Sequence, residues 1–391
     1  MSLSHQSNAR EPAFLASFAM SNDGWVTSPR PETVPDPATA QPEEYSDRRA
    51  TVMTAAGFAA ALLIGGLSIV PSPYAISAAG PTYDTLDVVE GVPLVSVTGA
   101  PTYPASGELR LTTVIVKDGG SKRFTMGTVL QGWLRADQYV LPREEVFGEP
   151  GERDEFDAAS QQAWISSQES AAVSALEASG IAVPAVLTVA GVLDGSNAMG
   201  VLEAGDVLLA FDGVPLETFA DLSGLLAAST PGADVRLTIE RSGTELDVSF
   251  ATLETDTGRA VMGVWIDPDF DLPVQVSVQI DAVGGPSAGL MFSLAIMDLL
   301  SEEDELGGAL VAGTGAINAD GDIAPIGGIR LKMIGARNAG STYFLAPVEN
   351  CDEVAGHIPD GLHVIAVDTL DNAYAAVLGI GSGRTDGLPT C

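Results

Sequence analysis

Basic side chains are scarce in this chain of 391 residues. Lysine and arginine together number 18 against 52 aspartates and glutamates, so the formal net charge is −34. A chain with this charge repels polyanions, which argues against nucleic acid and against an anionic membrane face as partners. The charge does not bear on the fold, but it suits a soluble body in a salty outside compartment.

Two further absences exclude whole classes of site. No lysine follows a glycine anywhere, so the phosphate-binding loop Gly-x-x-x-x-Gly-Lys-Ser/Thr of nucleotide hydrolases is missing. The three histidines and two cysteines do not fall at the spacing of metal ligands. We therefore expect no nucleotide, no metal and no other cofactor.

Charge is also absent from one long run near the N-terminus. Residues 1–47 are rich in proline, serine and acidic side chains, which predicts a disordered tail. Residues 51–70 are uncharged and long enough to cross a bilayer, which takes about 20 helical residues. Four arginines precede this run and no basic residue follows it before residue 110, so the N-terminus is predicted to be cytoplasmic and the body outside. A cleaved signal peptide is the alternative, but the long leader favours an uncleaved anchor.

A glycine-rich segment around one serine separates a predicted strand from a predicted helix. Residues 274–280 alternate apolar and polar side chains, as half-buried strands do. Residues 287–300 are apolar almost all round, as in a buried helix. Gly284 and Gly285 let other backbone approach closely. Ser287 is therefore predicted to lie at a helix N-terminus, where free N–H groups and the helix dipole stabilise an oxyanion.

One of only three lysines, Lys332, falls in the apolar stripe of a helix predicted to end near Gly340. It shares a helix face with Ile329, Met333 and Ala336. A lysine that snorkels from the edge of the stripe is the plainer interpretation. A buried lysine, however, loses its proton readily and can act as a general base. Beside a glycine-framed serine we favour the base.

These motifs resemble the proteolytic domain of Lon-type serine peptidases. The similarity rests on three segments, in order and with matching spacing: Gly285-Pro286-Ser287-Ala288-Gly289, Gly313-Thr314-Gly315, and Pro325-Ile326-Gly327-Gly328 followed by Lys332. The fuller resemblance covers nearly everything after the tail. It is to the membrane-anchored, PDZ-containing, Lon-like proteases of bacteria (the YlbL type).

The resemblance implies a role for each residue of the site. Ser287 would be the nucleophile, Lys332 its base, and Thr314 a supporting residue beside the lysine. Many Lon proteases have an acidic residue three positions before the serine, where this chain has Gly284. Any role of that carboxylate is then absent here or falls to another group such as Asp281.

Residues 186–256 resemble a PDZ domain. The similarity is clearest in Leu202–Gly213, where a Gly-Asp pair leads into a predicted strand and an Asp-Gly pair makes the turn after it. PDZ domains bind peptide C-termini by adding a strand to a sheet edge. The loop that would hold the carboxylate is not evident, and Gly180–Val183 is one candidate.

The predicted fold class is mixed α/β (α+β). A Lon-type proteolytic domain in residues 263–391 carries interleaved strands and helices, and the β-rich PDZ domain is inserted before it. Residues 74–180 are expected to form short strands and turns up to about residue 116 and to be mainly helical from 126 to 180. The resemblance implies that this part packs on the proteolytic body.

The two cysteines, Cys351 and Cys391, are both late in the chain. Counting alone leaves two free thiols open, but a body outside the membrane favours a disulfide.

Two other functions stay open. Gly-x-Ser-x-Gly also fits the nucleophile elbow of α/β-hydrolases, with Asp352 or Asp360 and His357 or His363 as partners, although Pro286 limits the strained elbow. A catalytically inactive PDZ adaptor on a membrane is the third function. We favour an ATP-independent, membrane-anchored Ser-Lys endopeptidase that cleaves unfolded or exposed polypeptide segments outside the cytoplasmic membrane. Its PDZ domain would bind substrate tails or gate the site, and the sequence leaves both roles open. Its substrates and its oligomeric state, including a homo-oligomer, are not determined by the sequence.

Overall fold

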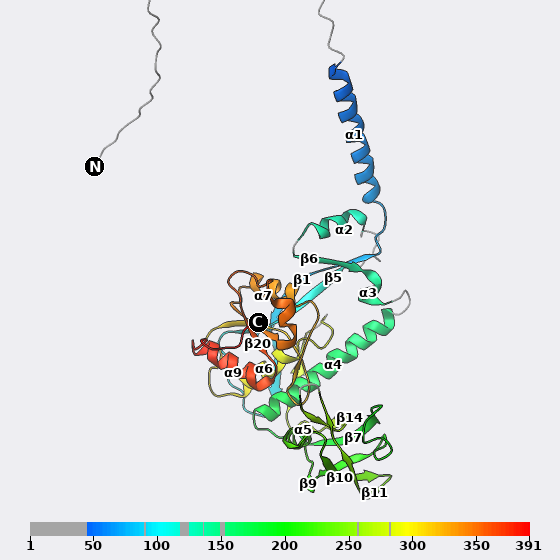
Figure 1. Cartoon of the computed structure of the whole chain (residues 1–391). Coiled ribbons are helices and arrows are strands. Elements are labelled where there is room, and N and C mark those ends of the chain that lie inside the picture. Colours follow the sequence, from blue (N-terminus) through cyan, green and yellow to red (C-terminus); the bar gives the residue numbers. More distant parts are fainter. Residues whose placement is uncertain are drawn as a thin grey trace, which may run out of the picture. The chain divides into compact units, whose positions relative to one another are not determined.

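The computed structural model describes residues 45–89, 91–117, 125–135, 137–148, 153–255, 258–280 and 283–391. Most of the tail predicted over residues 1–47 lies outside these ranges. Contacts divide the chain into two units, Met1–Ala61 and Leu62–Cys391. Figure 1 shows the elements coloured along the sequence.

Helix α1 (Tyr45–Leu67) contains the predicted apolar run. Its segment Arg48–Leu67 is long and apolar enough to cross a membrane, and none of it is buried within the protein. The helix ends at Leu67 rather than at residue 70, and the three residues between it and Pro71 form a turn. The Thr54 hydroxyl donates to the Ala50 carbonyl at 2.7 Å, so this polar group is satisfied inside the helix.

A six-stranded mixed sheet with the order β20-β19-β16-β5-β1-β6 forms the core of the second unit. Its strands are β1 (Tyr74–Asp84), β5 (Glu108–Lys117), β6 (Gln138–Pro142), β16 (Leu310–Gly313), β19 (Tyr343–Pro347) and β20 (His363–Val367). β1, β5 and β6 lie side by side in Figure 1. They precede the PDZ region, whereas the other three follow it. The N-terminal part does not merely pack on the proteolytic body, because it supplies half of the sheet.

Helices cover both faces of this sheet, as the alternation of side chains along its strands dictates. On one face Leu109, Val311 and Leu345 form one core with α4 (Arg153–Ala178), α6 (Gly289–Leu300) and α9 (Leu370–Gly381). On the other face Ala312, Phe344 and Val364 pack against α7 (Ile329–Asn338) and the short α8 (Cys351–Val354). Each large apolar side chain buried in these layers contributes about 1.5–3 kcal/mol of transfer free energy.

The segment expected to be mainly helical contains α2 (Met126–Trp133), α3 (Arg143–Phe147) and α4, but it also contains β6. β6 extends the sheet because Val140 and Tyr139 pair with Ile76 and Ser77 of β1. β1 and β5 are also longer than the short strands expected, with 11 and 10 residues. The predicted strand before the serine is β15 (Gln275–Val278), which pairs with β4 (Val95–Thr98).

A second sheet has the order β11-β10-β8-β7-β14. Its elements are β7 (Ala185–Val192), β8 (Val207–Phe211), α5 (Phe219–Ala228), β10 (Asp234–Arg241), β11 (Thr244–Ala251) and β14 (Val264–Phe270). β14 pairs with β7, Ile266 opposite Val189, although its residues were assigned to the proteolytic domain from residue 263. The predicted boundaries 186–256 are therefore too narrow, and the proteolytic part resumes after Phe270.

The turns of this sheet follow the predicted chemistry. Asp212 and Gly213 both adopt positive φ, of 49° and 83°, at the predicted Asp-Gly turn. The remaining short elements are β2 (Val88–Val89), β3 (Val92–Pro93), β9 (Val214–Pro215), β12 (Leu253–Glu254), β13 (Ala260–Val261), β17 (Ala316–Ile317), β18 (Ile323–Ala324) and the 3-10 helix η2 (Val348–Asn350).

Candidate active site

The loop that carries Ser287 lies between β15 and α6. Ser287 precedes the first residue of α6 by two positions, so it is not on the first helical turn as predicted but in the turn that enters the helix. Gly285 has φ of 80°, a conformation that glycine adopts without strain. Of the predicted residues nearby, Asp281 lies outside the described part of the chain.

Two residues of α4, Ser160 and Ser167, hold this loop, and no sequence motif predicted either contact. The Gly285 N–H donates to the Ser160 carbonyl at 3.2 Å. The Ser167 hydroxyl donates to the Pro286 carbonyl at 2.9 Å. Because one bond lies on each side of the glycine-proline step, α4 determines how Ser287 is presented.

The glycines around Ser287 give α4 room to approach. A Cβ at Gly289 would lie 2.7 Å from Ser167 Oγ, and a Cβ at Gly284 would lie 2.9 Å from Ser160 Oγ. Real Cβ atoms essentially never come this close to another heavy atom. Gly284 therefore has a packing role at the position where many Lon proteases have a carboxylate.

The segment Gly313–Gly315 holds Ser287 from the other side. The Ser287 carbonyl accepts two hydrogen bonds, from the Gly315 N–H at 3.0 Å and from the Thr314 hydroxyl at 2.8 Å. The Leu290 N–H donates back to the Gly315 carbonyl at 3.2 Å. The start of α6 is thus bonded to the segment that leaves β16.

Lys332 lies on α7 with its amine facing Ser287. Its Nζ is 2.7 Å from Ser287 Oγ and 2.8 Å from Thr314 Oγ1. The residue is only 4% exposed, and Ile329, Met333 and Ala336 on the same helix face are fully buried, as predicted. The structure therefore brings together the three polar residues that the motifs singled out.

Burial lowers the pKa of Lys332 from 10.5 to about 7, because the charged amine is removed from water. The hydrogen bonds also orient the amine. Thr314 has one hydroxyl hydrogen and donates it to the Ser287 carbonyl, so it accepts a hydrogen from Lys332. A neutral amine bonded in this way has its lone pair free for the hydroxyl hydrogen of Ser287.

Ser287 and Lys332 line a cleft of about 650 Å³. One wall is the second half of β5, residues 112–116, and the opposite wall includes Gly327 and the Ser287 loop. β16 pairs with β5 only from Glu108 to Leu111. In the described part of the chain, the edge of β5 beyond Leu111 has no strand partner on that side.

Two backbone N–H groups at the start of α6 could stabilise an oxyanion. Within the described ranges, the N–H groups of Ser287 and Ala288 have no intramolecular acceptor. The Gly285 N–H is not available for this, because it already donates to the Ser160 carbonyl. The oxyanion is therefore better placed against Ser287 and Ala288.

The residues of the hydrolase alternative do not assemble around Ser287. The His363 ring lies 5.6 Å from the Tyr343 ring, and His357 Nδ1 lies 3.0 Å from the Ala355 carbonyl. Neither histidine lines the cleft. In the residues that the structure describes, no group of three or more His, Cys, Asp or Glu side chains could hold a metal ion.

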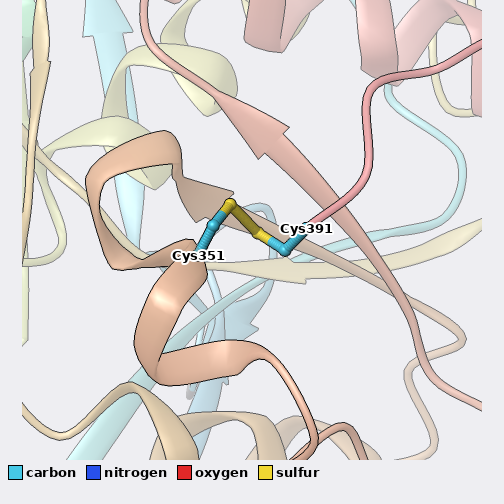
Figure 2. The surroundings of a disulfide bond; sticks show 2 residues. All are labelled: Cys351 and Cys391. Carbon is cyan, nitrogen blue, oxygen red and sulfur yellow. A yellow bond between two sulfur atoms is a disulfide. The ribbon is translucent and has the colours of Figure 1, made fainter.

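The two cysteines are joined. Cys351 at the start of α8 and Cys391 at the C-terminus form a disulfide, as Figure 2 shows. The bond ties the last residue of the chain to the layer that carries α7.

The segment Gly180–Val183, which was the candidate loop for a peptide carboxylate in the PDZ domain, does not have all the free N–H groups that such a loop needs. The N–H groups of Gly180 and Ile181 donate to the carbonyls of Glu177 and Leu176 at the end of α4. The segment Gly180–Val183 therefore caps a helix, and two of its N–H groups are not free to bind a peptide carboxylate.

Comparison with known proteins identifies both regions. Residues 270–379 match the family model of the Lon protease (S16) C-terminal proteolytic domain, and residues 188–241 match the PDZ domain. The chain thus contains a Lon-type proteolytic domain and a PDZ domain.

Curated relatives match about a quarter of the chain. Lon protease of Clostridium beijerinckii is 35% identical over 107 residues, which cover 26% of this chain and 13% of the relative. Lon protease 1 of Sorangium cellulosum is 35% identical over 105 residues, with the same coverage. The chain therefore corresponds to about an eighth of the length of these relatives.

Among solved structures, the PDZ domain of the SdrC-like protein from Listeria monocytogenes is similar at 18% identity. The match covers 21% of this chain and 86% of that chain, with a TM-score of 0.20.

Proposed function

We propose that this chain is an ATP-independent serine endopeptidase that works through a dyad of Ser287 and Lys332. The observation that carries the proposal is the 2.7 Å contact between Lys332 Nζ and Ser287 Oγ, at a lysine that is almost fully buried. A lysine with a pKa of about 7 is neutral in about half of the molecules at neutral pH, so it can accept a proton.

The mechanism follows from this geometry. Neutral Lys332 takes the hydroxyl proton of Ser287, and Oγ attacks the carbonyl carbon of the scissile peptide bond. The N–H groups of Ser287 and Ala288 stabilise the oxyanion. The Lys332 ammonium then gives its proton to the leaving amine. Water then gives a proton to the neutral Lys332 amine and attacks the acyl-enzyme. Ser287 leaves and takes the proton back from Lys332.

The proposed substrate is an extended polypeptide segment. The unpaired edge of β5 along residues 112–116 runs beside Ser287 in the same cleft, so a peptide can add there as a further strand. Only a segment without its own secondary structure can pair in this way. Unfolded chains and exposed tails therefore suit the cleft, and no nucleotide-driven unfolding is required.

We place peptide C-termini at the edge of the second sheet. β14 is one of its two terminal strands, with β11 at the other end, and β14 is the one that leads on to the proteolytic part. Pro268 within β14 is compatible with an edge strand, although it cannot donate to an added peptide. A peptide added to β14 would lie on the strand that leads, through β15, to the Ser287 loop. Deleting the PDZ part should therefore impair cleavage of a protein substrate more than cleavage of a short peptide.

We further propose that α1 anchors the enzyme in the cytoplasmic membrane with the body outside. Support comes from the length and apolar character of Arg48–Leu67 and from the arginines that precede it. Protease added to right-side-out spheroplasts should digest the body beyond Val70. Digestion limited to the N-terminal tail would reverse the orientation.

The decisive experiment measures cleavage of an unfolded protein by the full chain in detergent, without ATP. The wild type should cleave it, whereas Ser287→Ala and Lys332→Met should not. His363→Ala and His357→Ala are the matched controls and should stay active. Cleavage by Ser287→Ala, or a requirement for ATP in the wild type, would overturn the proposal.

A further inference from the structure

Helix α2 is uncharged in a strongly acidic chain. No residue from Met126 to Trp133 carries a charge, although the formal net charge of the chain is −34. Its inner side is covered, because Val129 is fully buried in a small core with Ile76 and Val140. Its outer side is not, since Leu130, Trp133 and the following Leu134 are 39%, 55% and 89% exposed.

This exposed face starts where the candidate membrane span ends. The Met126 N–H donates to the Val70 carbonyl at 3.1 Å, and Thr125 forms a bridge with Pro71. Ile69 and Val70 are themselves 80% and 50% exposed. The exposed apolar residues that follow the span are thus joined by backbone bonds to the start of α2.

The aromatic side chains in this region are of the kind found at membrane interfaces. The Trp133 ring contacts the Tyr74 ring edge-on, with 5.8 Å between centroids. Tryptophan and tyrosine concentrate at the headgroup level, where one end of the ring is apolar and the other is hydrated. Trp133 is half exposed, and Tyr74 is only a few residues beyond the span.

We propose that the outer face of α2 (Leu130, Trp133 and Leu134), together with Ile69 and Val70, lies in the lipid interface of the leaflet nearest the body. The inference rests on the proposed anchoring by α1. None of these five residues is basic, and Arg135 next to them is paired with Asp137, so in the described part of the chain the attraction comes from apolar burial rather than from anionic headgroups. A zwitterionic lipid surface is therefore sufficient, which fits the acidic charge of the chain.

The contact would give the enzyme a second attachment to the membrane. α2 packs on β1 and β6, the two strands at one end of the main sheet. With α2 in the interface, that end of the sheet is held at the lipid, and the body cannot swing freely on the linker after Leu67.

The test reconstitutes the full chain into phosphatidylcholine vesicles with and without bromine on the upper acyl carbons, and measures quenching of tryptophan fluorescence. The wild type should be quenched, and Trp133→Phe should lose roughly half of the quenching or more, because the ring at the interface no longer reports. Trp265→Phe is the matched control, since Trp265 is 64% exposed on β14 and should not contact lipid.

Flotation of the same vesicles separates the two proposals. If the protein does not float with the vesicles, the anchoring is wrong. If it floats but Trp133→Phe is quenched as much as the wild type, the α2 proposal is overturned. Leu134→Cys provides a second measurement: labelled with a polarity-sensitive dye, this variant should report an apolar interface. A signal that instead depends on protein concentration would assign this face to a second copy of the chain.

Discussion

The side chain of Asn350 hydrogen-bonds to both backbone polar groups of Ile326. The Ile326 N–H donates to Asn350 Oδ1, and Asn350 Nδ2 donates to the Ile326 carbonyl, each at 2.9 Å. The residue after Ile326, Gly327, lines the cleft, and the one after that, Gly328, accepts from the Lys332 N–H at 3.2 Å. Asn350 therefore positions the loop from which α7 and its lysine begin.

We expect Asn350→Ala to slow peptide cleavage about 100-fold, because misplacement of a catalytic group by about 1 Å has an effect of this size. Asn372→Ala, on α9, is the matched control and should leave the rate unchanged. A stability loss alone would not move the pH midpoint of the rate. A displaced loop would admit water to Lys332 and raise that midpoint. An unchanged rate and midpoint would show that Asn350 has no positioning role.

The rate of acylation should rise with pH through about 7, because burial lowers the pKa of Lys332 to that value and only the neutral amine accepts a proton. Single-turnover acylation by an ester substrate measures this directly. Lys332→Arg should be inactive, since arginine keeps its proton. Lys332→Met should be inactive yet melt no lower than the wild type, because an apolar side chain suits this buried position. A flat pH profile would contradict the assignment.

Thr314→Val should slow acylation about 10- to 100-fold, because the amine loses the acceptor that fixes its orientation. Thr314→Ser keeps the hydroxyl and should restore most of the rate. Stopped-flow measurement of both variants at pH 8 checks this. Equal losses in the two variants would indicate a packing role for the threonine methyl group instead.

Asp298 should make the protein less stable as pH rises. It is 3% exposed on α6, neither of its carboxylate oxygens has a hydrogen-bond partner within the described residues, and burial raises its pKa to about 7. An unfolded aspartate titrates near 3.9, so between about pH 4 and 7 the folded state binds more protons and stability falls with rising pH. Asp298→Asn should therefore stabilise by on the order of 1–2 kcal/mol at pH 8 and not at pH 4. Thermal melts with exposed Asp194→Asn as control would detect this, and an equal effect at both pH values would refute it.

The disulfide should stabilise the C-terminal layer. Cys351 and Cys391 are 40 residues apart, and closing a loop of this length contributes about 4 kcal/mol in the chain-entropy model. The tail also pairs with β20, where the Ala366 N–H donates to the Pro389 carbonyl at 3.0 Å. Cys391→Ser should lower the melting temperature as much as the double variant does. Alkylation of the native exported protein should find no free thiol, and two labelled thiols would contradict the bridge.

The sequence predicted those parts of the site that have a local signal. The apolar stripe around Lys332 predicted that its helix face is buried, and the all-apolar run after Ser287 predicted α6. The helical end near Gly340 was correct because glycine there has φ of 93°, which ends a helix. Each of these features depends on residues within a few turns of one another.

The other features of the site and the fold depend on contacts between distant residues, which produce no periodic pattern in the sequence. Ser160 and Ser167 lie on a helix with only a loose apolar stripe. Neither the Ser160 carbonyl nor the Ser167 hydroxyl, which bond to the distant Ser287 loop, gives a signal in the sequence. β14 was assigned to the wrong domain because its alternating acidic residues, Asp267 and Asp269, resemble those of any exposed strand. The pairing of β5 with β16 joins residues far apart in sequence, which local patterns cannot encode.

The pairing of β5 with β16 joins parts of the site that are synthesised at different times. Thr112 of β5 donates to the Gly313 carbonyl at 3.1 Å, across 201 positions of sequence. β5, which forms one wall of the cleft, is therefore synthesised well before the Ser287 loop, and Lys332 is synthesised after both. Until residues 310–332 have been synthesised, β5 cannot pair with β16, and Ser287 has no lysine beside it. The proposed dyad of Ser287 and Lys332 can therefore form only after the PDZ domain has been made.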